Sequence, residues 1–76
     1  MIQLSAKWAK ELLQSPETGM GYQVVTFVLQ DGRRFEQAAV VEGRVTQIRG
    51  RNDIPFTDAD IRKIIVTYDK WDFEHD

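Results

Sequence analysis

Two stretches that favour β-structure flank the dipeptide Asp31-Gly32, and this pattern constrains the fold more than any other feature of the chain. An Asp-Gly pair between such stretches is a strong hairpin signal, because a type I′ turn needs positive φ at both central positions. We therefore predict antiparallel strands over residues 22–30 and 33–41. With a two-residue loop, the predicted pairs are Val28 with Phe35, Thr26 with Gln37, and Val24 with Ala39.

Two more strands are predicted after this hairpin. Glu42-Gly43 is a weaker turn signal that leads to a third strand over residues 44–49. Val45 and Ile48 are three residues apart, so strict alternation cannot place both on one face. A β-bulge or a strong twist would bring both to the same side. A last strand is predicted over residues 62–68, which are rich in β-branched side chains.

One short helix is predicted at residues 5–14. The Ser5 hydroxyl can accept a hydrogen bond from the first turn, and Pro16 disfavours helical geometry at the residue before it. A helix of about ten residues is not stable alone in water, so it must pack on the rest of the domain. Its predicted apolar stripe consists of Trp8, Ala9, Leu12 and Leu13.

A single helical turn is predicted before the last strand, because Thr57 and Asp60 are spaced as in a capping box. The chain has 76 residues, fewer than the roughly 100–200 typical of one domain, so residues 1–76 are expected to form a single small domain. The predicted fold class is α+β. The short N-terminal helix packs on a small, strongly twisted antiparallel sheet or open β-barrel of about four strands.

Catalysis has few candidate residues in this sequence. There is no cysteine, which excludes disulfides, thiolate zinc sites and cysteine nucleophiles. The single histidine, His75, lies one residue from the C-terminal end, where order is least expected. A hard cation could be held only loosely, by Asp53, Asp58 and Asp60. We therefore expect no catalytic site, no cofactor and no metal site, and a protein that is not an enzyme.

No part of the sequence has the features of a membrane span or a secretory signal. No apolar run approaches 18 residues, and the N-terminus lacks a basic region followed by an apolar one. We therefore expect a cytoplasmic protein without a membrane partner.

Charge is unevenly distributed along the chain, although the net charge is only −2. Residues 31–51 carry five arginines against three acids. A guanidinium group can bind phosphate or carboxylate bidentately, so Arg33, Arg34, Arg49 and Arg51 are candidates for an anion-binding or RNA-binding surface. The alternative is a solvated face with cross-strand ion pairs, for example Glu36 opposite Arg49. The acidic net charge favours the solvated face.

Leu29–Phe35, followed by Ile48-Arg49-Gly50, is similar to two short stretches of Sm-like RNA-binding proteins. Such a resemblance would imply a small RNA-binding barrel. The Asp and Asn that form the base pocket in that family are missing here, and only the 12 residues 36–47 separate the stretches, too few for two long strands. No family is therefore assigned.

The C-terminal residues 69–76 alternate large aromatic side chains with charges. An extended backbone would place Trp71 and Phe73 on one side and the acids on the other. These rings are candidate anchors for a partner or a second copy, unless they pack on their own sheet near Trp8. The leading hypothesis is a non-enzymatic module for protein interaction or self-association. The alternative is a small-barrel domain that binds RNA or another anion through the arginines.

Overall fold

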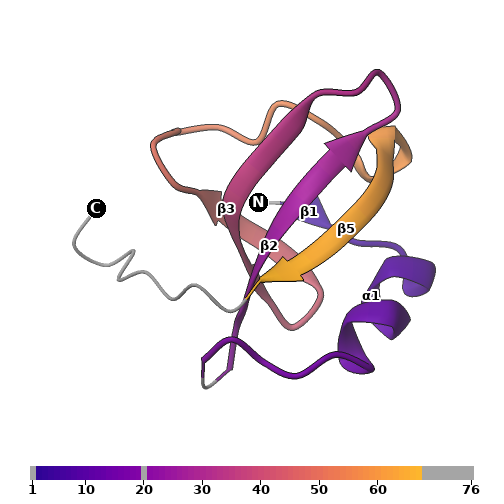
Figure 1. Ribbon diagram of the computed structural model, residues 1–76, viewed down its shortest axis with the longest axis vertical. Coiled ribbons are helices and arrows are strands. Elements are labelled where there is room, and N and C mark those ends of the chain that lie inside the picture. Colours follow the sequence, from indigo (N-terminus) through magenta and orange to yellow (C-terminus); the bar gives the residue numbers. More distant parts are fainter. Residues whose placement is uncertain (1, 20, 68–76) are drawn as a thin grey trace.

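The computed structural model describes residues 2–19 and 21–67. In chain order, its elements are β1 (Ile2–Gln3), α1 (Ala6–Leu13), β2 (Gln23–Leu29), β3 (Arg34–Val41), β4 (Arg44–Ile48), the 3-10 turn η1 (Asp58–Asp60) and β5 (Ile61–Thr67). The strands form one curled antiparallel sheet in the order β1-β4-β3-β2-β5 (Figure 1). The predicted α+β class is confirmed, and the sheet has five strands rather than about four.

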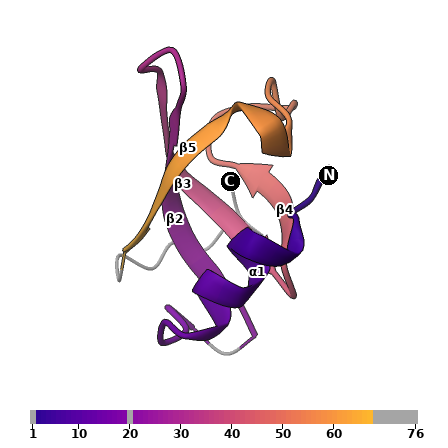
Figure 2. The same cartoon turned by 90° about the vertical axis from the view of Figure 1, so that its right-hand side faces the viewer.

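The additional strand is β1, which pairs with β4 so that Ile2 lies opposite Val45 and Gln3 opposite Arg44. Two residues are too few to produce the alternating pattern from which strands are predicted. The curled sheet and α1 enclose the main core, with α1 on the concave side (Figure 2). Within the described residues, no helix is long and apolar enough to cross a membrane.

The hairpin between β2 and β3 exists, but its loop has three residues rather than two. Leu29 N–H donates to the carbonyl oxygen of Arg33 at 2.8 Å, and Gly32 has a φ of 92°. Three-residue loops with a left-handed residue in the last position are a common hairpin solution. The longer loop shifts the register next to it, so Phe27 lies opposite Phe35. The predicted pair Val28–Phe35 is therefore wrong, since Val28 lies opposite Arg34, and Thr26 and Gln37 fall within a register shift rather than in a regular pair.

A β-bulge then restores the register further along the same pair of strands. The register shifts between Val25 and Phe27, and Gln37 on the facing strand has a φ of 54°. One extra residue on β3 compensates for the extra residue in the loop. Val24 consequently lies opposite Ala39, as predicted.

The turn between β3 and β4 is the tighter of the two. Glu42 and Gly43 have φ values of 50° and 76°, and Val41 pairs directly with Arg44, as in a type I′ turn. The β3–β4 register then shifts by one residue. This bulge lets Val45 and Ile48 join the same buried core, which confirms the irregularity that their spacing predicted.

Helix α1 buries a narrower stripe than the sequence predicted. Trp8 and Leu12 are buried in the main core, as expected, whereas the Leu13 side chain is 87% exposed. Each helical residue is rotated by about 100° from the one before. Since Leu12 faces the sheet, Leu13 must face away from it, and its predicted place in the buried stripe is wrong.

Side chains from distant parts of the sequence cap both ends of α1. Ser5 occupies the N-cap position, but its hydroxyl makes no capping hydrogen bond, so the predicted capping role is wrong. Instead, Ser5 N–H donates to Asp58 Oδ1 at 2.9 Å. At the other end, the buried Gln23 Nε2 donates to the carbonyl oxygens of Leu12 at 2.9 Å and Ser15 at 3.2 Å. These contacts fix the helix against η1 and β2.

Candidate functional site

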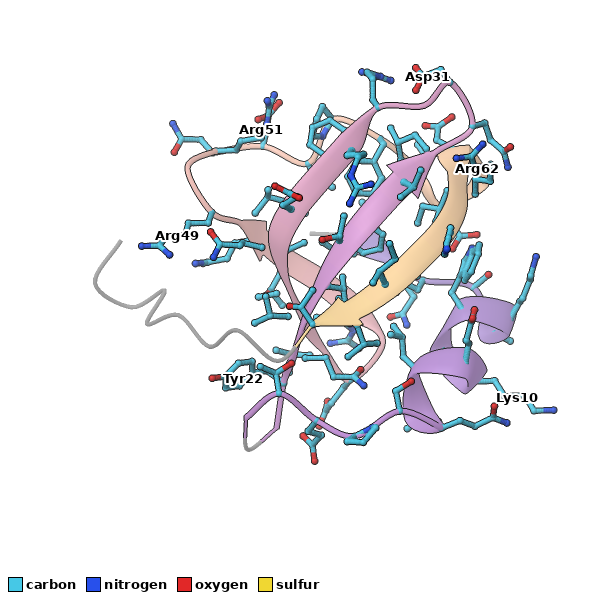
Figure 3. The ribbon with its side chains drawn as sticks, in the orientation of Figure 1. Lys10, Tyr22, Asp31, Arg49, Arg51 and Arg62 are labelled. Atoms are coloured by element: carbon cyan, nitrogen blue, oxygen red, sulfur yellow. The ribbon has the colours of Figure 1, made fainter. Side chains whose placement is uncertain are left out.

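The four candidate arginines lie near one end of β3 and in the segment after β4. Arg33 is in the β2–β3 loop and Arg34 begins β3, while Arg49 and Arg51 follow β4. We call these four residues the arginine surface. Figure 3 shows Arg49 and Arg51 along the same side of the molecule. The structure brings Arg33 and Arg51, one from each half of the predicted cluster, to the same aromatic ring.

The half-buried ring of Phe35 is the meeting point of two of these arginines. The Cζ atoms of Arg33 and Arg51 lie 6.0 Å and 5.5 Å from the centre of that ring. Phe35 in turn lies against Phe56, with ring centres 5.3 Å apart, and Phe56 lies 5.1 Å from Phe27. The ring stack runs from the core to the surface, and the two guanidinium groups lie near its outer end. Phe35 is thus already packed on the core side.

Acidic side chains neutralise much of the arginine surface. The salt bridges are Arg33–Asp31 at 2.7 Å, Arg51–Asp53 at 3.1 Å and Arg34–Glu36 at 3.8 Å. A hydrogen bond from the Arg33 backbone N–H, together with the Arg33 side chain, holds the pKa of Asp31 below its ordinary value of 3.8. An incoming phosphate would therefore have to compete with carboxylates that are already in place.

The expected pairing of Glu36 with Arg49 does not form across the strands. Arg49 N–H donates to the carbonyl oxygen of Gln37 at 3.2 Å, because the bulge in β4 shifts the register by one residue. Glu36 forms its salt bridge with Arg34 on its own strand instead. The solvated-face interpretation predicted ion pairs across strands, whereas the three salt bridges described above join residues two apart in sequence, so the predicted cross-strand pair is wrong.

The three acids considered for a cation lie in separate interactions. Asp53 pairs with Arg51, and Asp58 accepts from Ser5 N–H. Asp60 accepts from Thr57 N–H at 2.8 Å in the predicted capping box. Within residues 2–19 and 21–67, no group of three or more metal-binding side chains is found.

A second surface lies between α1, the segment leading to β2, and the β3–β4 turn. It is an open groove of about 550 Å³, which we call the Leu13 groove. The groove is held open by contacts at both walls: Gln23 fixes the end of α1, and Leu4 N–H donates to the carbonyl oxygen of Gly43 at 2.9 Å. Its apolar lining comprises Ala9, Leu12, Leu13, Tyr22 and Val40.

The charged residues of the Leu13 groove are both acidic. Glu17 lines it from the segment after α1, and Glu42 lines it from the β3–β4 turn. Both side chains are exposed, and neither forms a salt bridge with any described residue. No basic residue is found among the described residues that line the groove. The groove therefore combines apolar surface with two carboxylates that no described residue pairs in a salt bridge.

Sequence reasoning did not predict the Leu13 groove. The pairs Trp8–Leu12 and Ala9–Leu13 have the same spacing, and the pattern alone does not show which pair faces the sheet. The larger ring of Trp8 was the available signal, since burying it removes more apolar surface from water. Trp71 and Phe73 lie outside the described residues, so their role as partner contacts stays a prediction.

Comparison of the chain with protein-family models, with curated proteins and with solved structures found no match.

Proposed function

We propose that this domain is a non-enzymatic protein-interaction module that binds a segment of a partner protein in the Leu13 groove. The observation that carries the proposal is the Leu13 side chain, which is 87% exposed at the edge of an apolar groove. Among the residues that the structure describes, Leu13 is the large hydrophobic residue that is exposed to solvent. Contiguous exposed apolar surface is characteristic of interaction sites.

The size and construction of the groove support this function. Its volume of about 550 Å³ is within the range of roughly 300–1,000 Å³ that is typical of ligand pockets. Its walls are a helix and a tight turn that are joined to the core by hydrogen bonds, so the surface is formed before a partner arrives. A preformed surface loses less conformational entropy on binding.

The arginine surface offers weaker support for the alternative, RNA or anion binding. Three of its arginines are in salt bridges with neighbouring carboxylates. The Phe35 ring, which could stack on a base, is packed on Phe56 and lies within reach of two guanidinium groups. Binding of a phosphate backbone would gain less from a surface with this charge balance.

The proposal is tested with Leu13→Gln, which removes the exposed apolar group and keeps a good helix former. Lys10→Gln is the matched control, because Lys10 is exposed on the same helix and is not among the groove residues. Exposed substitutions usually change stability by less than about 0.5 kcal/mol, so both variants should remain folded. Proteins captured from a lysate are identified by mass spectrometry, purified and titrated against all three forms.

The proposal predicts that a purified partner binds the parent and Lys10→Gln equally, and binds Leu13→Gln at least about tenfold more weakly, a loss of roughly 1.4 kcal/mol. Measuring the solution mass of the parent over a range of concentrations distinguishes self-association from binding to another protein. If no partner depends on Leu13, or if only the oligomeric state changes with Leu13→Gln, the proposed function is wrong.

A further inference from the structure

We infer that the partner segment is basic as well as apolar, with a lysine or arginine next to the side chain that enters the Leu13 groove. This inference rests on the proposed function. It is carried by the two acidic residues of the groove, Glu17 and Glu42, which come from different segments and line the same groove as its apolar side chains.

The carboxylates of Glu17 and Glu42 differ from the other acids described above, which are already paired. Asp31 and Asp53 each form a salt bridge with an arginine, whereas the two groove carboxylates form none with the described residues. The nearest lysine on the same helix as Leu13 is Lys10. Its side chain extends outward from α1 (Figure 3), and it is not among the groove residues.

Complementary charge is the main way in which such a surface selects its partner. A lysine or arginine has an apolar stem that can lie on the groove lining while its charged end reaches a carboxylate. An acidic segment would instead bring like charges together, and their repulsion would weaken binding. The groove therefore favours a segment that has a large apolar side chain and a basic neighbour.

The same charges argue against two occupants from this chain. The C-terminal residues 69–76 contain four acids and one lysine, so Glu17 and Glu42 would repel them. A second copy that docked groove to groove would bring both pairs of glutamates to one two-fold interface, because such an interface uses the same patch twice. Charge complementarity thus points to a different, basic protein segment.

The test is a selection from a random library of 12-residue peptides displayed on phage, with the parent domain as bait. Leu13→Gln serves as counter-selection, so that retained peptides depend on the groove. Selected peptides are synthesised and titrated against the parent, Glu17→Gln/Glu42→Gln and Glu11→Gln/Glu36→Gln. The last variant is the control, since it changes the net charge by the same amount at exposed positions that do not line the groove.

Retained peptides should be enriched in lysine or arginine next to large apolar residues. Two exposed charge contacts correspond to a loss of about 2- to 30-fold in affinity in Glu17→Gln/Glu42→Gln, with little change in the control. The affinity for the parent should also fall as salt is raised, because exposed charges are screened.

The two proposals can fail separately in this experiment. Retained peptides that lack basic residues, or that bind Glu17→Gln/Glu42→Gln as well as the parent, would overturn the basic partner and leave the groove as a binding site. If the counter-selection with Leu13→Gln leaves no peptide, because every peptide that binds the parent also binds this variant, both the proposed function and this inference are wrong.

Discussion

The arginine surface and the Leu13 groove differ in how many of their charged and apolar groups already have a partner within the domain. Asp31, Asp53 and Glu36 pair with three of the arginines, so a surface that is rich in charge has little left for a ligand. The groove has fewer charges, but its carboxylates and the Leu13 side chain lack such compensation from the described residues. We therefore expect unpartnered groups, rather than the number of charges, to mark the binding surface of this domain.

The largest expected effect comes from removing the side chain that holds the helical wall of the groove. Trp8 is buried in the core, and Trp8→Ala should lower the free energy of unfolding by about 3–5 kcal/mol, because it leaves a cavity and removes apolar contacts. Lys10→Ala, an exposed change on the same helix, is the control.

This loss is measured by urea unfolding. In Trp8→Ala, binding of a partner at the groove should be lost at a lower urea concentration than the β-sheet. The arginine surface should persist with the sheet, because it is built on β3 and the segment after β4. If Trp8→Ala melts within a degree or two of the parent, α1 is not an integral part of the core.

The next largest effect is expected at Gln23, which satisfies carbonyl groups at the end of α1 beside the groove. Gln23→Met keeps the length of the side chain but removes the Gln23 donor from the Ser15 carbonyl oxygen and one of the donors to Leu12, whose carbonyl oxygen keeps the Ser15 N–H at 3.0 Å. Buried polar groups without a partner cost about 1–3 kcal/mol each, so we expect a loss in this range from urea unfolding. Gln14→Met, an exposed change at the C-cap of α1, is the control. An equal loss in both variants would contradict the role of Gln23.

The hairpins show how much of the fold could be predicted from the sequence. Local signals located both turns and all strands except β1, because Gly, Asp and β-branched residues act within a few positions of one another. The loop length was not predicted: Asp31-Gly32 forms a three-residue loop with Gln30, while the weaker Glu42-Gly43 signal forms the two-residue turn. Each bulge that corrects the register depends on contacts between strands, which a local pattern does not contain.

The candidate site was less predictable than the fold. The arginines were found from composition, but the acids that pair with them lie two residues away along the chain, as Asp53 does from Arg51, whereas pairs across strands were expected from the sequence. The Leu13 groove depends on which face of α1 meets the sheet, and on Gln23 reaching the end of the helix. Interactions between residues distant in sequence therefore determine the groove, whereas near neighbours in sequence neutralise the arginines.

The contrast between the two surfaces also predicts how this domain interacts with nucleic acid. We expect any binding of labelled single-stranded RNA in an anisotropy titration to be weak, even at low salt, and to depend on the four arginines. Each phosphate contact contributes a slope of about −0.7 in log affinity against log salt, so four arginines give at most about −2.8, and paired arginines give less. Binding that ignores salt, or that survives Ala substitution of Arg33, Arg34, Arg49 and Arg51, would contradict this account.

The smallest expected effect concerns how the stability of the fold depends on pH at the Asp31–Arg33 salt bridge. The pKa of Asp31 is lowered mainly by the hydrogen bond from the Arg33 backbone N–H, so the folded protein favours the ionised carboxylate. A carboxyl with a lowered folded-state pKa stabilises the fold at pH values above its unfolded-state pKa, and this contribution is lost as the pH falls through the folded-state pKa. Asp31→Asn keeps an oxygen acceptor for that N–H but cannot ionise.

The difference in stability between the parent and Asp31→Asn should therefore be constant above about pH 5 and shrink as the pH falls below the ordinary value of 3.8. The measurement is urea unfolding of both proteins at a series of pH values, with an NMR titration of the Asp31 carboxyl. A titration midpoint for Asp31 at or above pH 3.8 would show that Arg33 does not stabilise the ionised carboxylate in solution. Arg33 would then be more available to bind an external anion than its salt bridge implies.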